Sequence, residues 1–264
     1  MNPQYSYPGR YYDGLMETAD HPAWARFAQG AIDRFSRGET KTVLDLACGT
    51  GTLTALLAEA GYDMTAVDAS PEMLAEAQPK LARFTDPSVL LVQGDMRGYE
   101  LNDVVDCTVC ALGSLNYLTG RGDLVRCFKN VALFSRPDAL FLFDVDTPHK
   151  FETVYGGRDY VLEGDGILCA WQNDFDPKKG VCDFYLSFFE EQPDGSWLRT
   201  DEFERERLYT RRVIENALKA AGMELCGVFA GKPFDCFVPA SDADDRWMFA
   251  ARVKKQTAGR DFSN

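Results

Sequence analysis

The chain has 264 residues, of which 45% are hydrophobic and 26% charged, and its formal net charge is −13 at pH 7. This composition fits one large α/β domain, or a core domain with a modest insertion, and argues against a disordered chain. Nucleic acid is a poor partner for so acidic a chain, because Lys and Arg supply the affinity for phosphates. With no run of about 20 apolar residues and no signal-peptide pattern at its start, we expect a cytoplasmic protein without a membrane partner.

Apolar runs alternate with helical segments in the first part of the chain. A helix is predicted at 21–36, where apolar residues recur at spacings of three and four. Strands are predicted at 42–47, 62–68, 89–93, 105–111 and 139–145, and helices begin near residues 52 and 71. This alternation indicates crossover units and a parallel sheet.

The pattern changes after residue 146. Aromatic-rich runs at 167–175, 181–190 and 196–208 are separated by turn-forming residues and predict antiparallel hairpins. The α/β pattern resumes with a helix at 210–221 and strands at 224–230 and 246–253. The expected organisation is a core at 1–154 and 209–253, a β insertion at 155–208 that serves as a lid or dimer surface, and a polar tail at 254–264.

The eight cysteines are scattered, several of them inside apolar runs, as expected for reduced thiols in a core. Cys107 and Cys110 form a C-x-x-C, but they lie in a predicted strand, where positions three apart point to opposite faces. The sequence therefore predicts buried thiols and no metal site.

A glycine turn follows the first strand, in the run VLDLACGTG at 43–51. Gly49 and Gly51 can adopt positive φ and carry no side chain, so a ligand can approach the backbone closely. A dinucleotide site would have a third glycine where Thr54 stands. Asp45, just before the turn, would repel a pyrophosphate but suit a ligand with an ammonium and a sulfonium group.

Three further strand ends carry polar or glycine-containing runs. Asp68 ends the second strand at the spacing of a ribose-binding acid, a feature that several nucleotide ligands share. The third strand is followed by Gly94-Asp95-Met96, and the fourth by Ala111-Leu112-Gly113. Carboxyl ends of parallel strands meet at one edge of a sheet, so these runs predict one ligand site.

Together the four strand ends resemble the motifs of class I S-adenosylmethionine-dependent methyltransferases, in particular small bacterial members that act on small molecules. The first run is similar to the family's D-x-G-x-G-x-G, with Ala47 at the first glycine, and residues 11–16 resemble its Tyr-Asp-x-x-Met segment. The resemblance covers residues 11–150 well and the rest in outline. It implies a Rossmann-like, doubly wound, mostly parallel seven-stranded sheet with an inserted antiparallel β-hairpin subdomain.

The resemblance also implies which residues bind S-adenosyl-L-methionine, whose product is S-adenosyl-L-homocysteine. Asp68 would accept both ribose hydroxyls, Met73 would cover the adenine, and Asp95 would meet its amino group. The implied cofactor-binding set is Asp45, Ala47, Cys48, Gly49, Gly51, Asp68, Ala69, Met73, Gly94, Asp95, Met96, Ala111, Leu112 and Gly113.

The sequence leaves the attacked atom of the acceptor open between nitrogen, oxygen and carbon. Methyl transfer needs alignment and exclusion of water rather than a nucleophile or a metal. Substrate-side candidates are Tyr12, Tyr117 and His149, with Asp146 as a further base. The run at 111–114 lacks the Asn-Pro-Pro-Tyr-like pattern used for base or amide nitrogens, so we expect a small-molecule acceptor, no nucleic acid, and a monomer or homodimer.

Two other functions stay open at this point: a nicotinamide-dependent oxidoreductase, and a non-catalytic module that binds S-adenosylmethionine. Asp144 and Asp146 share a strand face, either as paired carboxylates or as a strand-end cap. Several aromatic side chains of the insertion either line an acceptor pocket or pack against the core: Trp171, Phe175, Phe184, Tyr185, Phe188 and Phe189.

Overall fold

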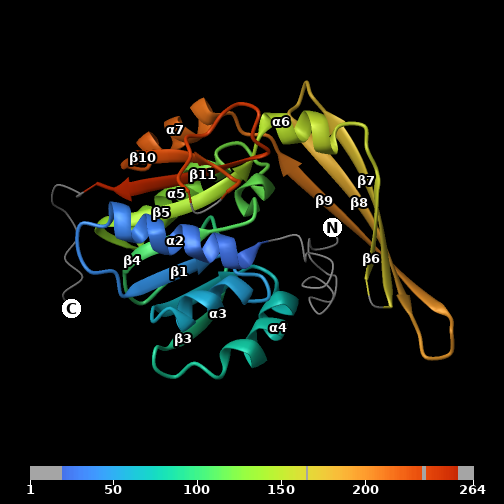
Figure 1. The fold of residues 1–264 in the computed structure, drawn as a ribbon, viewed down its shortest axis with the longest axis horizontal. Coiled ribbons are helices and arrows are strands. Elements are labelled where there is room, and N and C mark those ends of the chain that lie inside the picture. Colours follow the sequence, from blue (N-terminus) through green and yellow to red (C-terminus); the bar gives the residue numbers. More distant parts are fainter. Residues whose placement is uncertain (1–19, 165, 234–235, 255–264) are drawn as a thin grey trace.

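The computed structural model describes residues 20–164, 166–233 and 236–254. Its larger sheet has seven strands in the order β10-β11-β5-β4-β1-β2-β3 (Figure 1). Among these strands β11 alone runs opposite to the others, and it is antiparallel to both β10 and β5. The strands are β1 (Thr42–Leu46), β2 (Asp63–Asp68), β3 (Val89–Gln93), β4 (Val105–Cys110), β5 (Ser135–Asp146), β10 (Met223–Ala230) and β11 (Arg246–Val253). The predicted mostly parallel, Rossmann-like sheet is thereby confirmed.

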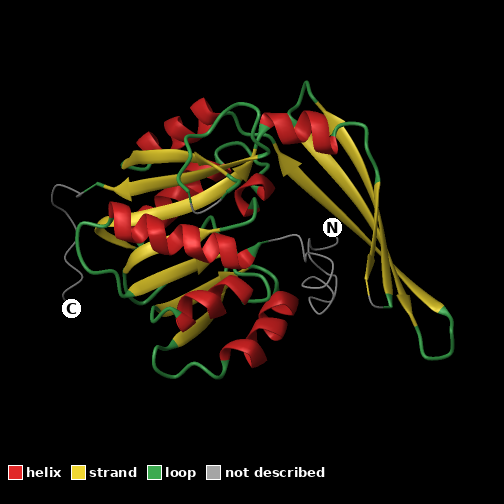
Figure 2. Ribbon diagram, in the orientation of Figure 1, coloured by secondary structure: helices red, strands yellow, loops and turns green. Residues whose placement is uncertain are grey.

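Helices cover both faces of this sheet (Figure 2). On one face lie α2 (His21–Phe35) and α3 (Thr52–Glu59), whose apolar stripes pack on alternate residues of the central strands. The other face is covered by α5 (Asp123–Leu133) and α7 (Arg211–Ala220). Beside α3 lies α4 (Pro71–Leu81), which begins at the predicted Ser70 cap, where the Ser70 hydroxyl accepts the Met73 amide at 3.2 Å.

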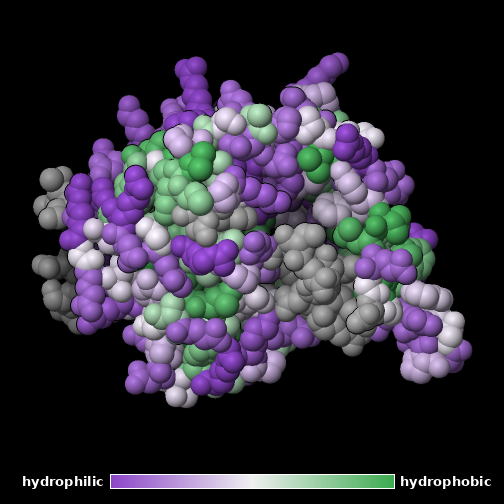
Figure 3. Space-filling model, viewed as in Figure 1, coloured by the Kyte–Doolittle hydropathy of each residue, from purple (hydrophilic) through white to green (hydrophobic). Residues whose placement is uncertain are grey.

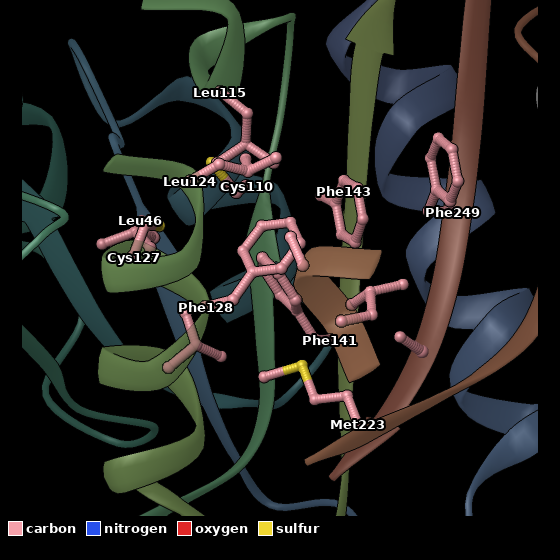
Figure 4. Close-up of a cluster of buried hydrophobic side chains, with 14 of the residues drawn as sticks. Leu46, Cys110, Leu115, Leu124, Cys127, Phe128, Phe141, Phe143, Met223 and Phe249 are labelled. Carbon is pink, nitrogen blue, oxygen red and sulfur yellow. The ribbon is translucent and has the colours of Figure 1, made fainter. Parts of the chain in front are cut away.

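Aromatic rings fill the layer between the sheet and α5 (Figure 4). The rings of Phe143 and Phe249 stack with centroids 4.8 Å apart and an interplanar angle of 4°. Phe128 of α5 packs against Phe141 and Phe143 at 5.2 and 5.3 Å. Burial of this kind stabilises by about 1.5–3 kcal/mol for each large side chain, so the layer holds the strand ends in fixed positions.

Cys107 and Cys110 are both fully buried, one in each core layer. Side chains alternate between the two faces of β4, so the two thiols lie on opposite faces, as their spacing predicts. Both therefore pack as small apolar side chains, and the described cysteines are free thiols.

A second sheet of four antiparallel strands extends from the core, in the order β6-β7-β8-β9 (Figures 1 and 2). Its strands are β6 (Tyr160–Gly164), β7 (Ile167–Asp176), β8 (Val181–Glu191) and β9 (Trp197–Arg207). The chain enters it from β5 through α6 (Pro148–Lys150) and the single-turn η3 (Phe151–Tyr155). Three of these strands match the predicted hairpins, whereas β6 is an additional strand.

The face of the second sheet toward the core is mostly buried, and we call it the inner face. Cross-strand pairing gives it these members: Trp171 and Phe175 of β7; Cys182, Phe184, Leu186 and Phe188 of β8; Glu202, Glu204 and Glu206 of β9. The opposite, outer face carries Tyr185 and Phe203, which are 47% and 44% exposed. Figure 3 shows apolar residues gathered over this sheet beside a mainly hydrophilic core surface.

No helix within the described ranges is long and apolar enough to cross a membrane.

Candidate active site

The glycine turn after β1 leaves open space on one side and is tightly packed on the other. Ala47, Gly49 and Gly51 all have positive φ, at 63°, 54° and 76°. A Cβ added to Gly51 would lie 2.8 Å from Leu81 of α4, whereas one added to Gly49 would meet no atom of the described residues within 4 Å. Gly51 is thus required for helix packing, and Gly49 borders a space that a ligand can fill.

Asp45 is buried at the end of β1. It is 1% exposed, and Thr54 donates a hydrogen bond to its Oδ2 at 2.5 Å. Burial, together with the nearby Asp68, raises the pKa of Asp45 to about 7 against the effect of this hydrogen bond. A cation next to Asp45 would favour the ionised form of its carboxyl. The turn therefore suits a positively charged ligand better than a pyrophosphate.

Asp68 is held in one orientation at the end of β2. Its Oδ2 accepts the Gly49 amide at 2.8 Å and its Oδ1 accepts the Ser70 amide at 2.9 Å. Burial raises the pKa of this carboxyl, although the backbone hydrogen bonds oppose the shift. Each carboxylate oxygen can accept a further hydrogen bond, so the group fits two vicinal hydroxyls such as those of a ribose.

The loop after β3 continues the same edge of the sheet. The Gly94 amide donates to the Asp68 carbonyl at 2.9 Å, and a Cβ on Gly94 would lie 2.9 Å from Tyr99. The Asp95 carboxylate accepts the amide and Nε of Arg97, both at 2.8 Å, and these bonds lower its pKa. Arg97 therefore orients Asp95, a role that the sequence did not reveal.

The loop after β4 is fixed by buried ionic contacts. Leu112 and Gly113 have φ of 61° and 75°, and the Gly113 amide donates to Asp144 Oδ2 at 3.0 Å. Asp144 also accepts Trp24 Nε1 at 3.1 Å and lies 3.1 Å from Arg246 Nε. These contacts make Asp144 a residue that positions the loop.

Asp146, the neighbouring acid on β5, is engaged on several sides. Lys150 Nζ lies 2.7 Å away, the Tyr155 hydroxyl donates at 2.6 Å, and Arg246 Nη2 is at 3.2 Å. Burial alone would raise the pKa of Asp146, but the two cations outweigh burial and lower it. A carboxylate held ionised in this way is a weak proton acceptor at neutral pH.

Asn116 ties the short helix η2 (Ser114–Tyr117) to both sheets. Its side chain is fully buried, accepts the Asp146 amide at 2.9 Å, and donates to the Arg207 carbonyl of β9 at 2.9 Å. Its neighbour Tyr117 donates from its hydroxyl to Glu204 Oε2 at 2.6 Å. The loop after β4 and the inner face of the second sheet therefore meet at the Tyr117–Glu204 pair.

Glu204 is a functional candidate that the sequence did not single out. It is 8% exposed, and burial raises its pKa to about 7, with the Tyr117 hydrogen bond acting in the opposite direction. The sequence feature that points to it is the placing of three acids, Glu202, Glu204 and Glu206, at alternate positions of one strand, where they share a face.

His149, another substrate-side candidate, is not joined to this cluster. His149 lies on α6 with its side chain 39% exposed, and its Nε2 is 3.9 Å from Asp245 Oδ1. Tyr12, with the surrounding 11–16 motif, lies outside the described residues. Of the two candidates within the described residues, Tyr117 is the one that contacts the inner face of the second sheet.

Within residues 20–164, 166–233 and 236–254, no group of three His, Cys, Asp or Glu side chains is placed to hold a metal ion. The groups assembled at the edge of the larger sheet are carboxylates, backbone amides and a tyrosine, which suit an organic ligand.

Comparisons with known proteins agree with this geometry. A family model described as a methyltransferase domain matches residues 43–138. "Putative methyltransferase YqeM" of Bacillus subtilis (strain 168) is 31% identical over 92% of this chain and 95% of that protein. The dTDP-3-amino-3,6-dideoxy-alpha-D-glucopyranose N,N-dimethyltransferase of Streptomyces fradiae is 25% identical, covering 77% and 81%. The crystal structure of a S-adenosylmethionine-dependent methyltransferase from Clostridium acetobutylicum ATCC 824 matches with a TM-score of 0.82 and 26% identity, covering 93% and 96%.

Proposed function

Since this chain belongs to the class I S-adenosylmethionine-dependent methyltransferases, we propose that it methylates an amino group of a small molecule. The observation that carries the proposal is the hydrogen bond from Tyr117, in the loop after β4, to the buried Glu204. The similar protein from Streptomyces fradiae is by its name an N,N-dimethyltransferase of an amino sugar, which supports nitrogen as the attacked atom.

The residues at the strand ends fit S-adenosylmethionine. Asp68 would accept the two ribose hydroxyls, Asp95 the adenine amino group, and Gly49 leaves the backbone open beside them. Asp45 would balance the positive charge of the donor. The bound donor supplies an activated methyl group on a sulfonium, so the protein has to align the acceptor and exclude water.

An amine must lose its proton before its lone pair can attack the methyl carbon. Tyr117 would receive the ammonium proton on its phenolic oxygen while its own proton passes to Glu204 Oε2, 2.6 Å away. A carboxyl group with a pKa near 7 is suited to accept that proton at neutral pH. The free amine then forms the N–C bond as the C–S bond breaks, which leaves a neutral thioether.

The test is incubation with S-adenosylmethionine that carries a trideuterated methyl group, first with a metabolite extract and then with purified amines. We expect products heavier by one labelled methyl, and fragmentation that locates the label on nitrogen. Tyr117→Phe should lower kcat by about tenfold to a hundredfold and shift the pH profile, while S-adenosylhomocysteine binds as before.

Label on oxygen or carbon would contradict the amine acceptor. Binding of S-adenosylhomocysteine without any labelled product would favour the non-catalytic module.

A further inference from the structure

The inner face of the second sheet carries buried carboxyl groups, and the outer face carries exposed ion pairs. Glu202, Glu204 and Glu206 occupy alternate positions of β9 and are 7%, 8% and 6% exposed. On the outer face, Arg205 is paired with Asp183 and Arg199 with Asp201. Along β9, buried carboxyl groups therefore point to the inner face, and the charged side chains of the exposed ion pairs point to the outer face.

Glu206 has a buried oxygen that the described residues leave without a partner. Its Oε2 makes no hydrogen bond to any part of the chain that the structure describes. Leaving a buried polar group unpaired costs about 1–3 kcal/mol, which a ligand with a matching group would recover. Burial, Asp146 and Glu204 raise the pKa of Glu206, and this effect outweighs that of Lys150 and Arg246, which act in the opposite direction.

The surrounding charges show what kind of ligand fits. Asp146, which lies near enough to Glu206 to raise its pKa, and its neighbour Asp144 are balanced by two cations, Lys150 and Arg246. These four charges cancel, so the ionised form of Glu206 would add uncompensated negative charge in a buried position. A cationic ligand would supply the missing charge, whereas a phosphate would be repelled.

An apolar surface adjoins these carboxyls. Trp171 packs edge-on against Phe184 with centroids 5.7 Å apart, and Tyr155 packs against Phe184 at 5.0 Å. Phe184 and Cys182 lie directly opposite Glu204 and Glu206 across the β8–β9 pair. Aromatic rings beside carboxylates form a surface that binds aliphatic ammonium groups.

We propose that the inner face binds the body of the acceptor and a second cationic group, so that the acceptor is an aliphatic amine with at least two ammonium groups and no phosphate. This rests on the proposed function, since the reacting amine is the one at Tyr117. Alternate side chains of a strand lie about 7 Å apart, so ammonium groups near Glu204 and Glu206 would match a spacer of about four carbons.

The test compares binding of 1,4-diaminobutane and 1-aminobutane to the enzyme saturated with S-adenosylhomocysteine, measured by calorimetry. The diamine should bind at least about tenfold more tightly, as expected for one additional charged hydrogen bond. Glu206→Gln keeps the shape of the side chain but should remove most of that preference, with little change for the monoamine. Asp201→Asn, on the exposed outer face of the same strand, should leave both affinities unchanged.

Equal affinity of the wild-type enzyme for the two amines would overturn the inference without the use of any variant. Tighter binding of phosphoethanolamine than of ethanolamine would overturn it as well. If Glu206→Gln does not fold, Trp171→Leu, which removes an aromatic ring from the inner face, provides a second variant, and an unchanged preference for the diamine in that variant counts against the inner face. N-methylation of amines without a preference for the diamine would leave the proposed function in place and refute only this inference.

Discussion

Replacing Glu204 with Gln should make the protein more stable and less active. The unfolded chain releases the Glu204 proton near pH 4.5, whereas burial raises the pKa of the folded carboxyl to about 7. Between these values the folded state binds more protons, so stability falls as pH rises and becomes level above about pH 7. At about 1.4 kcal/mol for each pH unit, the ionised Glu204 costs folding about 3 kcal/mol.

Urea unfolding at pH 5 and pH 8 measures this cost. Glu204→Gln removes the ionisation while its amide oxygen can still accept the Tyr117 hydroxyl. The stability gained over wild type should therefore be about 2–3 kcal/mol larger at pH 8 than at pH 5. Turnover should fall, because an amide does not accept the acceptor's proton.

Asp201→Asn is the matched control, since Asp201 is exposed on the outer face of the same strand and its change should not depend on pH in this range. An equal gain from Glu204→Gln at both pH values would refute the buried-acid reasoning. Full activity with an unchanged pH profile would refute the role of Glu204 as proton acceptor.

Three further substitutions test the cofactor edge and the junction of the two sheets. Asp68→Ala should weaken S-adenosylhomocysteine binding by at least about 1.5 kcal/mol in calorimetry, because a charged acceptor is lost, and unchanged affinity would place the ribose elsewhere. Ala47→Gly should raise the free energy of unfolding by up to about 1 kcal/mol, since φ of 63° strains a residue with a Cβ; a loss of stability would contradict this reasoning. Asn116→Ala should cost about 2–4 kcal/mol in urea unfolding, because the buried Asp146 amide and Arg207 carbonyl lose their partner, and stability near that of wild type would show that the junction does not depend on it.

Much of the fold followed from local patterns in the sequence. The helix expected at 21–36 is His21–Phe35, because an apolar stripe and an N-terminal cap at Asp20 define both its existence and its start. The strand Tyr160–Gly164 was not foreseen. It has only five residues, none of them buried, and it forms a strand through pairing with β7, a tertiary contact that periodicity does not reveal.

The donor side and the acceptor side of the proposed site likewise differ in how far the sequence predicts them. The donor side depends on residues a few positions apart at consecutive strand ends, so sequence spacing was enough to propose it. The proposed acceptor side depends on Tyr117 and Glu204, which are 87 positions apart. On β9 hydrophobicity would place Phe203 inward, yet Phe203 is 44% exposed and Glu204 is buried, because pairing with β8 sets which residues share the inner face.

Asp45, on the proposed donor side, and Glu204, on the proposed acceptor side, are buried acids, and in both burial raises the pKa to about 7. Methyl transfer removes the sulfonium charge of the donor but leaves its ammonium group, so Asp45 would have one positive charge fewer beside it after transfer. Asp45→Asn should therefore weaken binding of S-adenosylmethionine more than binding of S-adenosylhomocysteine, by about 1 kcal/mol, as expected for one charge–charge contact in a partly shielded site. Calorimetry at pH 8 measures both affinities, and Thr54→Val, which removes a hydrogen bond but keeps the acid, is the matched variant. An equal loss for the two ligands would show that Asp45 supports the turn rather than the charge of the donor.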